Sequence, residues 1–206
     1  MDPVSAPRAR RARGPYAKTA ATRAAILDAA LEVFAEAGYR GGSLRHIAER
    51  VGMSEPALMH HFHSKAGLLQ GVLDHRDQRS YAIAPIDRLP GEQSIRGLIA
   101  LVRHNASTPG VVELYAILAA EATSDSHPAH GYFVSRYEFV RASIVDSFRQ
   151  LEEEGQLAAG VTPQSAADAT IAIMDGLQVQ WLLDRGALDM ADELAAFLRI
   201  ITRLEL

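Results

Sequence analysis

The sequence predicts an all-α protein in which a small helix-turn-helix domain precedes a larger helical domain. Apolar residues recur at helical spacing along most of the 206 residues, and no stretch shows the alternation that is typical of a strand. Gly and Pro separate the periodic stretches, as they do at helix ends. Charge divides the chain as well: the part through Arg79 carries a net charge of +4 and the remainder a net charge of −8.

The clearest motif runs from Ser43 to Lys65, SLRHIAERVGMSEPALMHHFHSK. Ser43 is placed to cap a first short helix, and Gly52 permits a tight turn after it. Ser54 is placed to cap a second helix at about Glu55–Phe62. Two helices this short cannot bury their own apolar faces, so a third helix is required beneath them. The pattern is that of a helix-turn-helix.

The third helix is predicted at Thr22–Ala37, where apolar residues line one face and Gly38 follows. Together the three helices form a compact unit. Its predicted core includes Phe34, Ile47, Leu58 and Phe62.

The run ILDAALEVFAEAGYRGGSLRHIAERVGMSEPALMHHFHSKAGLL resembles the N-terminal signature of the tetracycline-repressor-like (TetR) family of transcriptional regulators. The resemblance covers roughly a quarter of the chain. It implies a repressor that binds a palindromic operator in double-stranded DNA as a homodimer and is released by a small-molecule effector. One position departs from the family pattern, because Met59 stands where the family usually has a tyrosine on the recognition helix.

The resemblance also implies which side chains face DNA. Ser43, at a helix N-terminus, can bind a phosphate, and Lys65 matches the family's phosphate-binding lysine. Ala57 is small enough to approach a thymine methyl group. Each of these residues could instead be ordinary solvated surface. The expected DNA-binding residues are Ser43, Arg45, Ser54, Ala57, Met59, His60, His61 and Lys65.

Three segments are expected along the chain. Residues 1–18 are rich in Arg among Pro, Ala and Gly, which indicates a flexible basic arm. Such an arm either follows DNA phosphates and the minor groove or is only a solubilising tail. Residues 19–83 form the DNA-binding domain with a linking fourth helix that reaches about Arg79. Residues 84–206 form the effector-binding and dimerisation domain, entered through a Pro-containing loop.

The C-terminal segment is predicted to be helical throughout. Its periodic runs are separated by short stretches rich in Gly, Pro, Ser and Asp. The expected helices are Glu92–Asn105, Gly110–Thr123, Pro128–Glu154, Pro163–Asp184 and Met190–Leu204.

The last two predicted helices favour self-association. The helix from Pro163 is apolar on more than one side, so one side can meet the domain's own core while another needs a partner. With the last helix it forms a plausible four-helix interface around a twofold axis. The expected interface residues are Ile173, Leu177, Gln180, Leu194, Phe197 and Ile201.

Large amphipathic side chains in this segment suggest a ligand cavity, although such residues at helical spacing often simply fill a core. The family resemblance favours a cavity for a mostly apolar effector. The expected effector-binding residues are His104, Tyr115, Phe133, Tyr137, Met174, Gln178 and Trp181.

Two other classes of protein were weighed. An enzyme is disfavoured because the sequence has no nucleophile elbow, phosphate loop or metal-ligand spacing. A helical adaptor that binds protein partners explains the helices but not the basic arm or the helix-turn-helix. No cofactor or metal is expected: cysteine is absent, and the adjacent His60 and His61 point about 100° apart on a helix. The absence of a long apolar stretch and of a signal sequence predicts a cytoplasmic protein with no membrane partner.

Overall fold

The computed structural model describes residues 15–206, with side chains described from residue 19 onward. The described chain consists of helices joined by short turns, and its only β pairing is an isolated bridge between Leu157 and Thr202. None of the helices in this range is both long and apolar enough to cross a membrane. The helices are α1 Pro15–Gly41, α2 Leu44–Arg50, α3 Glu55–Phe62, α4 Lys65–Ile83, α5 Gly91–Ala106, α6 Pro109–Glu121, α7 His130–Glu153, α8 Pro163–Leu183 and α9 Met190–Ile201.

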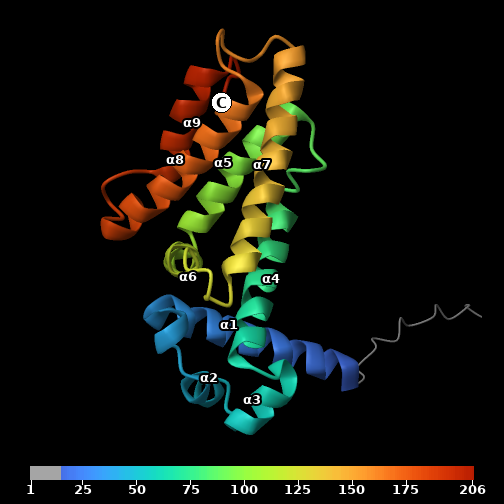
Figure 1. Cartoon of the computed structure of the whole chain (residues 1–206), viewed down its shortest axis with the longest axis vertical. Coiled ribbons are helices and arrows are strands. Elements are labelled where there is room, and N and C mark those ends of the chain that lie inside the picture. Colours follow the sequence, from blue (N-terminus) through green and yellow to red (C-terminus); the bar gives the residue numbers. More distant parts are fainter. Residues whose placement is uncertain (1–14) are drawn as a thin grey trace, which may run out of the picture.

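Helices α1, α2 and α3 form the lower part of the molecule, with α1 lying across the base of α4 (Figure 1). The helical run of α1 is broken at Gly38, whose φ of 65° and ψ of 179° are accessible to glycine and strained for other residues. Arg50 ties α2 to α1 through ion pairs with Glu32 and Glu36, each at 3.0 Å. The predicted three-helix unit is therefore confirmed.

The apolar core has two parts. The lower part joins α1–α4 and contains Phe34, Ile47, Leu58 and Phe62, as expected from the sequence. It also takes in Leu114 and Leu118 of α6, together with Phe133 at the start of α7. Helix α6 therefore lies directly over α1, although it belongs to the C-terminal segment of the sequence (Figure 1).

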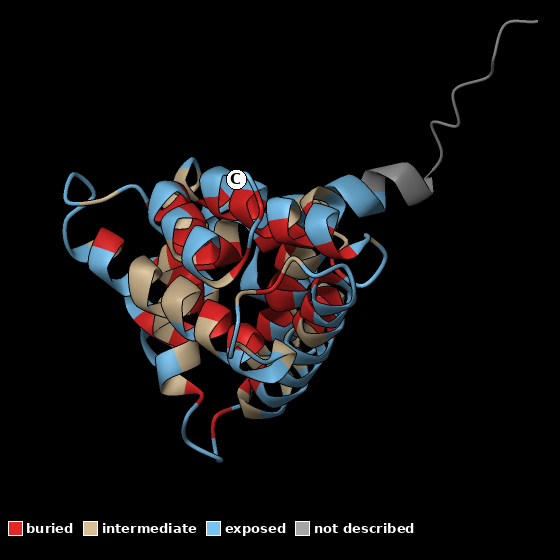
Figure 2. Ribbon diagram, turned by 90° about the horizontal axis from the view of Figure 1, so that it is seen from above, coloured by how far each residue is buried: buried red, intermediate tan, exposed pale blue. Residues whose placement is uncertain are grey.

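The upper core joins α5, α7, α8 and α9 around buried residues such as Ile95, Ile144, Phe148 and Leu198. Seen from above, buried residues line the inner sides of the helices and exposed residues cover their outer sides (Figure 2). Helix α4 runs upward from the lower part beside α7, so a single continuous element connects the two cores (Figure 1).

Most helix boundaries agree with the sequence prediction within two residues. Helix α1 begins earlier, at Pro15, inside the range assigned to the basic arm, while residues 1–14 of that arm lie outside the described residues. Helix α4 continues beyond Arg79 to Ile83 and stops before Pro85, because the residue preceding a proline disfavours the helical conformation. Helix α9 ends at Ile201, because Arg203 donates its backbone N–H to the Gln156 carbonyl at 2.7 Å and pairs the chain end with the α7–α8 loop.

Candidate nucleic-acid interface and ligand cavity

Three serines position the helices of the helix-turn-helix. Ser43 Oγ accepts a hydrogen bond from His46 N at 3.4 Å and caps α2. Ser54 Oγ accepts from the backbone N–H of Ala57 at 3.3 Å and caps α3. Ser64 caps α4 in the same way. These local hydrogen bonds explain why the helix starts could be predicted from sequence.

The outer face of α3 is open to solvent. Ser54, Ala57 and His60 are exposed, while His61 is half-buried. Met59, at the position of the departure from the family pattern, packs partly against the lower core. A small residue flanked by polar ones is a surface that can approach base edges in a major groove.

Two of the expected DNA-binding residues are cations on the helices that precede and follow α3. Arg45 of α2 is exposed and pairs with Glu49 at 2.9 Å, one helical turn away. Such an exposed pair contributes little stability and can exchange for a phosphate contact. Lys65 begins α4; its Nζ donates to the Arg40 carbonyl at 3.2 Å and lies 4.8 Å from the centre of the Tyr39 ring. Partial burial lowers the pKa of Lys65, although nearby Glu121 opposes this effect.

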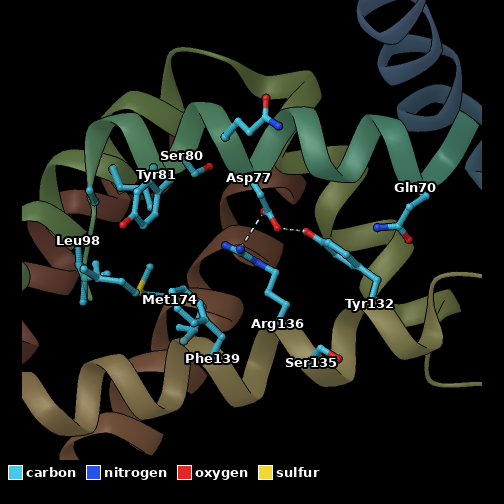
Figure 3. Close-up of a pocket in the computed structure, with 15 residues that line it drawn as sticks. Gln70, Asp77, Ser80, Tyr81, Leu98, Tyr132, Ser135, Arg136, Phe139 and Met174 are labelled. Carbon is cyan, nitrogen blue, oxygen red and sulfur yellow. Dashed lines mark hydrogen bonds and ion pairs between the residues drawn. The ribbon is translucent and has the colours of Figure 1, made fainter. Parts of the chain in front are cut away.

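A cavity of about 620 Å³ lies between α4, α5, α7 and α8. This size is within the usual range for small-molecule sites. Side chains along α4 form one wall and side chains from α7 face them across the cavity (Figure 3). The lining residues are Gln70, Asp77, Gln78, Ser80, Tyr81, Ala84, Ile86, Leu98, Leu101, Tyr132, Ser135, Arg136, Phe139, Val140 and Met174.

A partly buried polar network borders the cavity. The Asp77 carboxylate pairs with Arg136 Nη1 at 2.8 Å and with Arg76 Nη1 at 3.1 Å. Tyr132 Oη donates to the same carboxylate at 2.7 Å (Figure 3). Burial is the main reason why the pKa of Tyr132 is raised, so its hydroxyl stays protonated and acts as a donor. Burial alone would lower the pKa of Arg136, but nearby Tyr115 and Asp77 outweigh burial and raise it.

The structure does not bring the seven expected effector residues together. Met174 lines the cavity, and His104 lies at a much smaller hollow beside α4. Tyr115 and Phe133 are buried in the lower core, where their ring centroids are 5.2 Å apart. Helix α6 packs on α1, so its Tyr115 faces the lower core.

Trp181 and Gln178 lie in the upper part of the molecule, while Tyr137 packs against both cores. Tyr137 is half-buried and donates a hydrogen bond to Asp175 at 2.7 Å. Trp181 is buried in the upper core, with the Arg185 guanidinium 5.2 Å from its ring. Gln178 is half-buried on α8.

Sequence reasoning missed the polar residues of the cavity. Asp77, Ser80 and Tyr81 share one face of α4, and Tyr132, Arg136 and Phe139 share one face of α7 by the same spacing rule. These two polar helix faces can be recognised in the sequence. Their pairing across 55 residues, from Asp77 to Tyr132, is set by the tertiary fold and cannot be read from either helix alone.

The expected self-association residues differ in how far they are buried. Ile173, Leu177, Phe197 and Ile201 are half-buried and pack on the upper core, while Gln180 is exposed. Leu194 is completely buried within its own chain and therefore cannot touch a partner. Three further apolar side chains on these helices are exposed: Val179 at 51%, Leu183 at 84% and Ile200 at 75%.

Family comparisons match two regions of the chain. Residues 26–72 match the family described as bacterial regulatory proteins, tetR family. Residues 92–204, more than half of the chain, match the family described as BetI-type transcriptional repressor, C-terminal.

Individual proteins show the same similarity. The chain is 32% identical to the transcriptional repressor KstR2 of Mycobacterium tuberculosis over 142 residues. The aligned region covers 65% of this chain and 68% of that protein. It is 27% identical over 161 residues to the repressor Rv1474c of the same species, with coverages of 77% and 81%. The solved structure of NalD, the secondary repressor of a multidrug efflux pump in Pseudomonas aeruginosa, is 25% identical with a TM-score of 0.65, covering 92% of this chain and all of that chain. Each of these relatives is a transcriptional repressor.

Proposed function

The chain belongs to the TetR family of bacterial transcriptional regulators, and we propose that it binds a palindromic operator as a homodimer and is released by a small molecule in the cavity beside α4. The observation that carries this proposal is the double role of α4. Lys65 begins this helix at the end that follows α3 in the chain, while Gln70, Asp77 and Tyr81 of the same helix line the cavity.

In the proposed complex α3 enters the major groove. Ala57 approaches the bases closely, while Ser54 and His60 are exposed on the same helix and can hydrogen-bond to base edges or phosphates. Lys65 and Arg45 exchange their present partners for phosphate oxygens. Met59 supports the helix from its partly buried position, so the contact that a tyrosyl hydroxyl would make there is absent.

Dimerisation through α8 and α9 would present two such faces to the two half-sites of a palindrome. The support for this surface is the exposure of Ile200 one turn from half-buried Phe197 on α9, together with half-buried Leu177 and exposed Leu183 on α8. Exposed apolar residues gathered on one pair of helices commonly mark an interface.

Ligand control would act through the position of α4. A ligand in the cavity touches side chains of α4 and α7 at once, so it favours one separation of these helices over another. A change in the tilt of α4 moves Lys65 and with it the DNA-binding face. A coupling of about 1–3 kcal/mol, which is typical of allosteric proteins, would reduce operator affinity by about 5- to 150-fold.

We also propose that the DNA-binding domain spans residues 19–83 and that residues 84–206 carry the ligand and dimer functions. The turn after Ile83 supports this division. The contact of α6 with α1 makes the two domains interdependent, because α6 completes the lower core.

The experiment that tests this function compares two Ala→Glu substitutions in mobility-shift assays with DNA from upstream of the protein's own gene. Ala57→Glu places a negative charge on the outer face of α3, and Ala142→Glu places one on the exposed side of α7 as a matched control. The wild type and Ala142→Glu should form a discrete complex in excess competitor DNA, while Ala57→Glu should not, because its carboxylate repels the phosphates. Equal binding by both variants would remove α3 from the interface.

A further inference from the structure

The cavity is amphipathic along its length. Gln70, Asp77, Tyr132 and Arg136 lie toward one end, while Leu98, Phe139 and Met174 lie toward the other (Figure 3). A molecule that fills both ends must therefore carry a polar group at one end and an apolar body at the other. This reasoning rests on the proposed function, in which the cavity holds the effector.

The polar end has little capacity left for a cation. Its only lining carboxylate, Asp77, already takes two guanidinium groups and one tyrosine hydroxyl. A ligand cation at this carboxylate would have to displace Arg76 or Arg136, and each arginine would then lie in a poorly hydrated site without its partner. Repulsion between the ligand cation and the two arginines adds to this cost.

An anion finds better conditions at the same place. Arg136 Nη1 binds Asp77 and Nε donates to Tyr115 Oη at 3.3 Å, while Nη2 makes no hydrogen bond within residues 19–206. Ser135, the residue before Arg136 on α7, lines the same cavity and its hydroxyl also makes no hydrogen bond within the described part of the chain. Arg136 therefore keeps a free charged donor at this end, while the cavity lining has no carboxylate without a cationic partner.

Asp175, another acidic group near this network, does not make the site favourable for a cation. Asp175 of α8 does not line the cavity and accepts a hydrogen bond from Tyr137. Burial raises the pKa of Asp175, although the Tyr137 hydrogen bond and the two arginines oppose this shift. The negative charge of Asp175 is therefore less favourable in the folded protein than on an exposed aspartate.

We infer that the effector is an amphipathic carboxylate, whose anionic head binds Arg136 Nη2 and whose apolar body lies against Leu98, Phe139 and Met174. Charge-assisted hydrogen bonds to a guanidinium are about twice as strong as neutral ones, so the carboxylate head supplies specificity. The apolar body supplies affinity through burial.

Three probes with the same apolar chain and different heads test the inference: dodecanoate, dodecanol and dodecyltrimethylammonium. Calorimetric titration of the full-length wild-type protein, below the micelle concentration of each probe, should give a dissociation constant for dodecanoate at least about tenfold lower than for the other two. Equal binding of the alcohol, tighter binding of the ammonium compound, or no binding by any of the three overturns the inference. The Ala57→Glu experiment requires no ligand, so the proposed DNA-binding function is judged separately.

A pair of substitutions on α7 locates the head group. Arg136→Gln should abolish the preference for dodecanoate over dodecanol, and Arg141→Gln, an exposed arginine that pairs with Asp168 outside the cavity, should retain it. The preference is a ratio within one variant, so a general loss of stability does not imitate it. Retention of the preference in a folded Arg136→Gln protein would place the carboxylate elsewhere. If this variant does not fold, the wild-type comparison still decides the charge of the ligand.

Discussion

The Glu121 carboxylate, at the end of α6, accepts a hydrogen bond from the backbone N–H of Tyr39 at 3.0 Å. This contact joins residues 82 positions apart and lies where the run of α1 is broken at Gly38. Tyr39 in turn lies against the ammonium group of Lys65. The end of α6 therefore holds the segment that supports the proposed phosphate-binding lysine.

Glu121→Gln should weaken this link and lower the free energy of unfolding by about 1 kcal/mol, because the Gln carbonyl still accepts from the partly buried N–H but no longer carries a charge. Urea denaturation measures the change. Glu113→Gln, on the same helix and without a hydrogen bond or ion pair among the described residues, is the matched control and should stay within about 0.5 kcal/mol of wild type. Similar stabilities for the two variants would show that the Tyr39 contact contributes little.

Stability should depend on pH through Asp175. Burial raises the pKa of its carboxyl, so the folded protein retains this proton at higher pH than the unfolded chain, whose Asp pKa is about 3.9. The contribution of this group to stability is therefore greatest below that value and falls as pH rises through the folded pKa. Asp175→Asn keeps an oxygen that can accept from Tyr137 but cannot ionise. Denaturant unfolding at several pH values should show that the variant lacks this fall and is at least as stable as wild type at neutral pH.

Asp168→Asn is a control, because the contribution of Asp168 to stability should change with pH in the opposite direction. Hydrogen bonds from Gln164 and Arg141 lower the pKa of Asp168, so its contribution is present above the unfolded pKa and is lost as pH falls. The effect should be small because this residue is exposed. A wild-type pH dependence unchanged by Asp175→Asn would contradict the assignment to Asp175.

Trp181→Ala tests whether Trp181 is a core residue. The ring is buried in the upper core, so its removal should lower the free energy of unfolding by roughly 3–5 kcal/mol. Trp181→Phe should cost less because most of the volume is kept. If Trp181→Ala kept its full stability in thermal and urea unfolding and lost only its response to a ligand, the residue would belong to the effector site after all.

Ile200→Glu tests the dimer surface. Ile200 is 75% exposed in the single chain, so the substitution costs the subunit little but places a charge in the proposed apolar interface. Sedimentation at micromolar concentration should show a monomer. Val134→Glu, at a partly exposed apolar position on α7, should leave the dimer intact. A dimeric Ile200→Glu protein would exclude this part of α9 from the interface.

The parts of the fold that depend on local interactions could be predicted from the sequence. Ser43, Ser54 and Thr162 cap helices through hydrogen bonds to residues three positions ahead, so the starts of α2, α3 and α8 are visible as short patterns. The cavity depends on which faces of distant helices meet. Tyr115 and Phe133 were expected to line the cavity, but both fill the lower core. Helix α6, which carries Tyr115, turns back onto α1.

The measurement that tests the central claim most directly is the salt dependence of operator binding by wild type and Lys65→Ala, followed by fluorescence anisotropy. If each subunit places Lys65 on a phosphate, the variant should bind all DNA sequences more weakly. Its slope of log affinity against log salt should be shallower by about 0.9 per subunit, hence about 1.8 for the dimer. Arg103→Ala, an exposed cation on α5 paired loosely with Asp192, should retain the wild-type slope. An unchanged affinity and slope in Lys65→Ala would contradict the proposal that the start of α4 contacts DNA.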